Sequence, residues 1–133
     1  MQIRQLFIFL VALASSNLAW SQASQHSGHG SGSSDMNCIK AKVSNFNPAH
    51  LANIAPGGEF SFMVSGSNGP GHIHVTIREQ AVPLKVESKD TFYLAKGNLP
   101  AEIKNQTVRI SYSAKAKNSK CDADGGWLVK VSE

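Results

Sequence analysis

Two histidines separated by a single residue are the clearest candidates for chemistry in this sequence. His72 and His74 lie in a run, residues 72–78, that alternates polar and apolar side chains. In a β-strand, side chains two positions apart point to the same face and stand about 6.6 Å apart, so both imidazoles could bind one metal ion. Imidazole nitrogen binds copper and zinc at about 2.0–2.1 Å. The pair therefore indicates either a metal site or two ordinary surface histidines.

A second pair of histidines precedes this run. His26 and His29 lie in residues 24–36, a segment rich in Ser, Gly, Gln and His that offers little to anchor it to a core. Such a composition predicts a flexible tail. Because two ligands make only half a metal site, one hypothesis is a copper or zinc binder in which this tail completes the site begun by His72 and His74. The predicted fold requires no metal, so a bound metal would serve function.

The first 23 residues predict a signal peptide. Arg4 precedes the apolar residues 6–13, and Ser21 and Ala23 fit the small-residue positions of a cleavage site. No other run approaches the roughly 20 apolar residues of a membrane span. We therefore expect an exported protein, periplasmic or extracellular, with no membrane span. Loss of Arg4 lowers the net charge from +4 to +3, and the scattered basic residues argue against nucleic acid as a partner.

The two cysteines predict a disulfide. Cys38 and Cys121 both remain after removal of the signal peptide, and an even pair in an oxidising compartment is typical of one covalent bridge. This bridge would tie the first strand to the end of the domain.

The spacing of turn residues predicts a single all-β domain over residues 37–133. Clusters of Gly, Pro, Asn and Asp separate short alternating segments, and no segment has a helical period. Seven such segments favour an antiparallel sandwich of the immunoglobulin-like or fibronectin-like kind. The predicted strands are residues 37–43, 59–65, 72–79, 82–87, 91–94, 106–115 and 127–131.

Alternation within each strand predicts which side chains form the core. The inward set, in chain order, is Ile39, Ala41, Val43, Phe60, Phe62, Val64, Ile73, Val75, Ile77, Val82, Leu84, Val86, Phe92, Leu94, Val108, Ile110, Tyr112, Trp127, Val129 and Val131.

The outward residues of the third, sixth and seventh strands predict a binding face, because these strands lie side by side in the usual sandwich order. No carboxylate falls within this predicted set, so we expect a positive face that attracts a protein or an anionic ligand. An ordinary solvated sheet face is the alternative. The predicted face consists of His72, His74, Thr76, Arg78, Thr107, Arg109, Ser111, Ser113, Lys115, Leu128 and Lys130.

The sequence favours a binding module over an enzyme. It contains no Gly-x-Ser-x-Gly elbow, and a disulfide would occupy both cysteines, which leaves no obvious nucleophile. The acidic residues fall mostly at predicted strand ends and turns, where solvated carboxylates are expected. A structural subunit of a surface assembly is a further alternative, and the oligomeric state is left open.

Overall fold

The computed structural model describes residues 38–133, which form β-strands and short 3₁₀ turns. The all-β class and the two-sheet architecture are confirmed. The predicted signal peptide and tail, with His26 and His29, lie outside the described residues. Within residues 38–133 there are nine strands rather than seven: β1 (Lys42–Asn47), β2 (Asn53–Ile54), β3 (Glu59–Ser65), β4 (Ile73–Ile77), β5 (Gln80–Val82), β6 (Lys85–Ser88), β7 (Tyr93–Asn98), β8 (Gln106–Ala114) and β9 (Ala123–Val131).

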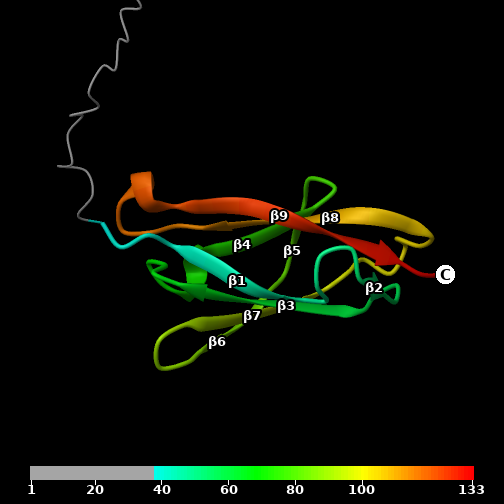
Figure 1. Cartoon of the computed structure of the whole chain (residues 1–133), viewed down its shortest axis with the longest axis horizontal. Coiled ribbons are helices and arrows are strands. Elements are labelled where there is room, and N and C mark those ends of the chain that lie inside the picture. Colours follow the sequence, from blue (N-terminus) through cyan, green and yellow to red (C-terminus); the bar gives the residue numbers. More distant parts are fainter. Residues whose placement is uncertain (1–37) are drawn as a thin grey trace, which may run out of the picture. The chain divides into compact units, whose positions relative to one another are not determined.

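The strands form two layers. One sheet has the order β1-β3-β7-β6 and the other the order β2-β9-β8-β4-β5, and Figure 1 shows β8 and β9 in one layer and β3, β7 and β6 in the other. All neighbours are antiparallel except β2 and β9, which are parallel. Since β8 lies between β9 and β4, the third, sixth and seventh predicted strands do lie side by side.

The core lies between the sheets and follows the predicted alternation on most strands. Phe60 and Phe62 of β3 have no exposed surface, and Val75 and Ile77 of β4 are almost as deeply buried. Every member of the predicted inward set is buried or packs against the core except Ile39, Phe92 and Leu94. The core also contains residues from outside the predicted strands, of which Ile54, Leu99 and Ile103 are the largest.

The alternation on β7 was predicted one residue out of step. Ala95 and Gly97 face the core, whereas Leu94 is paired with Met63 on the outer side of its sheet. The physical reason is the partner strand: Ala95 lies opposite Phe62, and Gly97 lies opposite Phe60, whose ring would come within 2.6 Å of a Cβ atom there. Small inward residues make room for these aromatic rings, so hydrophobicity alone misassigned Phe92 and Leu94.

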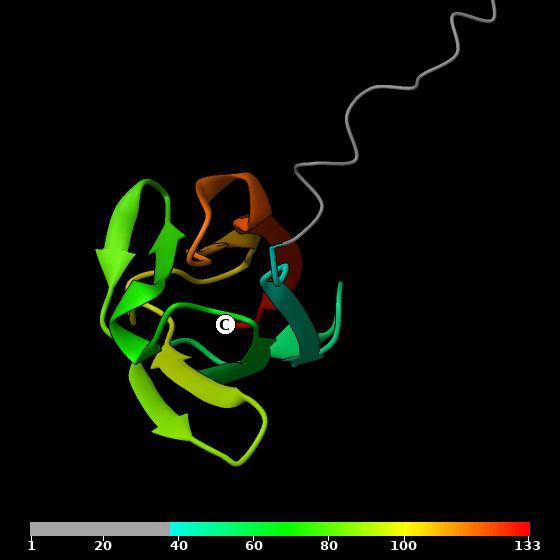
Figure 2. The ribbon, with the colours of Figure 1, turned by 90° about the vertical axis from the view of Figure 1, so that its left-hand side faces the viewer.

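The predicted strand over residues 82–87 is in fact two strands in different sheets. β5 pairs with β4, and β6 pairs with β7. Pro83 lies between them and has no backbone N–H for a ladder hydrogen bond, so the pairing ends there. The chain then crosses from one sheet to the other, which is visible in Figure 2 between the green β4–β5 hairpin and the yellow-green β6.

The first strand begins later than predicted. β1 starts at Lys42, and Ile39, expected in the core, is 77% exposed. The pairing of β1 with β3 shifts between Ser44 and Asn47, a β-bulge in which Asn45 has a φ of 53°. The bulge turns Phe46 toward the core, where its ring centroid lies 4.7 Å from that of Trp127.

β9 begins before a glycine pair that the sequence predicts as a turn. Gly125 and Gly126 are paired with Tyr112 and Ser111 in the middle of the sheet. A Cβ atom at Gly125 would lie 2.5 Å from the hydroxyl oxygen of Tyr112. Only glycine therefore leaves room for the tyrosine side chain above this position. Close approach of a side chain, rather than chain reversal, explains this glycine.

The free edge of β9 is covered by the segment that carries β2. The backbone N–H of Leu51 donates to the Leu128 carbonyl oxygen at 2.7 Å, and the N–H of Lys130 donates to Ala52 at 2.9 Å. His50 completes this edge, because its Nδ1 accepts a hydrogen bond from the Leu128 N–H at 3.2 Å. His50 therefore has a structural role in satisfying the edge of the sheet.

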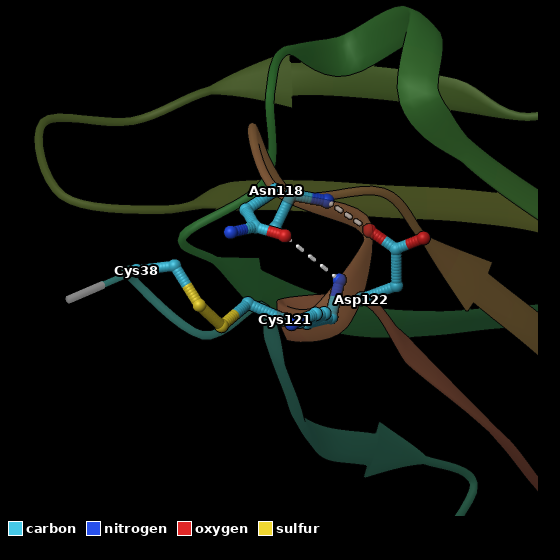
Figure 3. Close-up of a disulfide and its surroundings, with 6 residues drawn as sticks. Cys38, Asn118, Cys121 and Asp122 are labelled. Carbon is cyan, nitrogen blue, oxygen red and sulfur yellow. Dashed lines mark hydrogen bonds between the residues drawn. A yellow bond between two sulfur atoms is a disulfide. The ribbon is translucent and has the colours of Figure 1, made fainter. Parts of the chain in front are cut away.

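The predicted disulfide is present. Cys38 is bonded to Cys121 in the loop between β8 and β9, beside Asn118 and Asp122 (Figure 3). The Asp122 carboxylate accepts a hydrogen bond from the Ala116 N–H at 2.7 Å and lies 3.2 Å from Lys115 Nζ. The backbone hydrogen bond, followed by the lysine, holds the pKa of Asp122 below its usual value. Asp122 and the disulfide together fix this loop.

The β4–β5 hairpin turn yields a stability prediction. Arg78 and Glu79 form a two-residue loop in which both have positive φ, 51° and 65°, the geometry of a type I′ turn. Glycine is much the better residue at the second position, so Glu79→Gly is expected to raise the free energy of unfolding by about 0.5–1 kcal/mol. Urea unfolding measures this change. Glu79→Ala keeps the unfavourable backbone geometry and is expected to give no gain; an equal gain from alanine would contradict the turn assignment.

Candidate functional site

The candidate site is the outer side of the β9-β8-β4 part of the five-stranded sheet, hereafter the outer face. Register places its residues in rows that cross the strands. One row contains His74, Ser113 and Asp124, and the next contains Thr76, Ser111 and Gly126. Two further rows pair Arg109 with Leu128 and Thr107 with Lys130. The side chains of His74, Thr76, Thr107, Arg109, Asp124 and Lys130 are exposed.

Eight of the eleven residues of the predicted face lie within the strands of this face, and four of these have exposed side chains flanked by deeply buried residues. His74 and Thr76 come from β4, Arg109 from β8 and Lys130 from β9, and all four residues alternate with buried neighbours. The alternation that buries Val75, Ile110 and Val129 therefore places these polar groups in solvent.

The other three predicted residues lie outside the strands. His72 belongs to the 3₁₀ turn Pro70–His72 that precedes β4, and its carbonyl accepts the Lys115 N–H at 3.0 Å. Lys115 forms an ion pair with Asp122. Arg78 lies in the hairpin turn and donates through Nη2 to Gln106 Oε1. These side chains border the outer face.

The expectation that no carboxylate lies on this face was wrong. β9 begins at Ala123, four residues earlier than the predicted strand, and Asp124 is paired with Ser113. The glycine pair was interpreted as a turn, so the sequence placed Asp124 in a loop. The outer face is therefore mixed in charge: Asp124 and His74 lie at one end, and Arg109 and Lys130 lie toward the other.

Gly126 positions Arg109 on the sheet. A Cβ atom at Gly126 would lie 2.8 Å from Arg109 Nε and 3.1 Å from Cζ, so the guanidinium group lies directly over the glycine. Within residues 38–133, the Arg109 side chain has neither an acidic partner within ion-pair distance nor a hydrogen-bond partner. The N–H donors of Arg109 are therefore available to a ligand. Any side chain at position 126 would displace the guanidinium group from this position.

The outer face has an open hollow at the end where His74 and Asp124 lie. The hollow has a volume of about 210 Å³ and is lined by His74, Thr76, Ser111, Tyr112, Ser113 and Asp124. Ser113 of β8 lies between His74 of β4 and Asp124 of β9, and Ser111 lies beside Thr76 of β4. Among residues 38–133 no group of three or more His, Cys, Asp and Glu side chains is arranged to hold a metal ion.

Comparison with known protein families and with curated proteins finds no match for this chain. Over residues 38–133 the structure also contains no helix that is long and apolar enough to cross a membrane.

Proposed function

We propose that this protein is a small exported binding module, not an enzyme, that contacts a protein or an anionic ligand through the outer face. The observation that carries the proposal is the Arg109 guanidinium group, which lies over Gly126 and has no hydrogen-bond or ion-pair partner among the described residues. Arginine binds carboxylate and phosphate groups through paired N–H donors. Lys130 and Thr107 in the adjacent row extend this basic, hydrogen-bonding surface.

The sheet order supports a finer description of the fold as an immunoglobulin-like sandwich. Constant-type domains of that class have strands in the order ABED in one sheet and CFG in the other. The orders β1-β3-β7-β6 and β9-β8-β4 correspond to these two patterns, with β2 and β5 as additional edge strands of the second sheet. The disulfide is placed differently, because it joins the start of the domain to the β8–β9 loop rather than the two sheets through the core.

Export is part of the same proposal. The disulfide is compatible with an oxidising compartment, periplasmic or extracellular, where such bonds form and persist. A binding module in that setting works in the presence of dissolved salt, so a contact made through exposed charges should weaken as the ionic strength rises.

Poly-L-glutamate is a suitable probe of the basic end of the outer face. We expect amide NMR signals of Thr107, Arg109 and Lys130 to shift on titration with it at low salt. Arg109→Ala/Lys130→Ala is expected to weaken binding by about 2- to 30-fold, since two exposed charge contacts are worth about 0.2–1 kcal/mol each. The measurement is the dissociation constant from the titration.

The matched control removes the same charge from other exposed sites. Lys42→Ala/Lys85→Ala leaves the outer face intact, because Lys42 is paired with Ser65 and Lys85 with Lys96 in the other sheet. We expect this variant to bind the polymer as the wild type does. Equal weakening in both double variants would show that only net charge matters and would overturn the assignment of the outer face.

A further inference from the structure

We propose that His74 and Asp124 form a site for a divalent transition-metal ion, Cu²⁺ or Zn²⁺, above Ser113 on the outer face. The sequence pairs His74 with His72 instead. That pairing assumed one continuous strand, but His72 lies in the preceding 3₁₀ turn, with its ring carbon Cδ2 3.8 Å from where a Cβ atom of Gly69 would stand. His72 does not line the hollow, whereas His74 and Asp124 both do.

The register of three strands brings the two ligands into one row. His74 of β4 is paired with Ser113 of β8, and Ser113 is paired with Asp124 of β9. Neighbouring strands lie about 4.8 Å apart, so the backbones of His74 and Asp124 are about 9.6 Å apart. Two metal–ligand bonds of about 2 Å each account for part of this distance, and an imidazole and a carboxylate leaning over the short serine can span the rest.

The space between the two side chains is open. Both residues line the hollow of about 210 Å³, with serine and threonine hydroxyl groups between and beside them. Among residues 38–133, neither the His74 nor the Asp124 side chain has a hydrogen-bond or ion-pair partner, so no protein group competes with a metal for these ligand atoms.

The ligand types select the class of ion. One imidazole nitrogen and one carboxylate oxygen suit Cu²⁺ and Zn²⁺, and for such mixed nitrogen and oxygen sites Cu²⁺ binds more tightly than Zn²⁺. Mg²⁺ and Ca²⁺ require more oxygen ligands than this row offers. Two protein ligands leave further coordination positions for water, so the ion would be exchangeable and accessible from solvent.

The test is a calorimetric titration of Cu²⁺, then of Zn²⁺, into the purified protein with His26→Ala/His29→Ala as the common background, which removes the histidines of the N-terminal segment. We expect His74→Ala and Asp124→Asn each to weaken Cu²⁺ binding at least about tenfold, because even indirect partners of a metal are worth about 10–100-fold. The matched controls are His72→Ala and Asp90→Asn, an exposed acid in the β6–β7 turn, and both are expected to bind as the background does.

Electron paramagnetic resonance of the copper-loaded protein gives an independent readout. We expect coupling to one imidazole nitrogen in the background protein and in Asp90→Asn, and its loss in His74→Ala. Unchanged binding in both His74→Ala and Asp124→Asn would overturn the site. If His72→Ala loses Cu²⁺ binding while Asp124→Asn binds as the background does, the proposed site is overturned in favour of the pair of His72 and His74. Arg109→Ala/Lys130→Ala is expected to bind Cu²⁺ as the wild type does. The metal titration and the poly-L-glutamate titration therefore test separate proposals, and either can fail without the other.

Discussion

Trp127→Ala is expected to lower the free energy of unfolding by about 3–5 kcal/mol, the usual cost of removing a large aromatic side chain from a core. Trp127 is 3% exposed and lies at the centre of an aromatic group. Its ring centroid is 4.7 Å from that of Phe46, 5.9 Å from Phe62 and 6.0 Å from Phe60. Alanine would leave a cavity between the two sheets, because these rings cannot all move to fill it.

The tryptophan also makes a polar contact that a second variant isolates. Its Nε1 donates to the Pro48 carbonyl oxygen at 3.0 Å and so joins β9 to the segment after β1. Trp127→Phe keeps much of the packing but loses this hydrogen bond, and we expect an intermediate loss of about 1–3 kcal/mol. Guanidinium unfolding followed by circular dichroism measures both values. A loss below about 1 kcal/mol for alanine would show that the ring is not central, and Ile39→Ala serves as the exposed control.

Cys38→Ala/Cys121→Ala is expected to lower the free energy of unfolding by up to roughly 4.5 kcal/mol, the chain-entropy value for a loop of this length. The two cysteines are 83 residues apart, so the bond restricts nearly the whole unfolded domain. In the folded protein, the Ala41 N–H donates to the Cys121 carbonyl oxygen at 2.9 Å, so the backbones remain joined after the sulfur atoms are removed. We therefore expect a folded but less stable protein.

Reduction provides the control for this variant. A thiol reductant should destabilise the wild type by a similar amount and leave Cys38→Ala/Cys121→Ala unaffected, as judged by the midpoint of urea unfolding. If the variant and the wild type unfold at the same urea concentration under oxidising conditions, the bridge contributes nothing to stability and the expectation is wrong.

The sequence predicts a strand well where that strand alternates large apolar and polar residues. β3 has the predicted bounds, residues 59–65, and β4 and β8 differ by only a few end residues. Both faces of these strands carry clear signals, because most inward residues are Phe, Val or Ile and the outward ones, apart from Met63, are polar. The side-by-side placement of β4, β8 and β9 followed from the usual sandwich order.

The predictions of strand bounds and of exposed residues failed where a residue is small because a side chain on the neighbouring strand occupies the space above it. Gly97 and Gly125 lie within strands because Phe60 and Tyr112 need the space above them, and a single sequence does not show which side chain lies across a sheet. Because glycine was interpreted as a turn signal, Asp124 was assigned to a loop and left out of the predicted face. Cross-strand register, which pairs residues far apart in the chain, was required to bring His74 and Asp124 into one row.

The four outer strands of the two sheets bear on how this molecule behaves at high concentration. An exposed, long and flat outer strand invites pairing with a second chain. Here β2 has two residues and β5 has three, β6 carries Lys85 and Glu87 within four, and β1 is bent by the bulge at Asn45. Each of these devices disfavours fibril-like stacking of copies, so a partner has better access to the broad side of the sheet than to its margins.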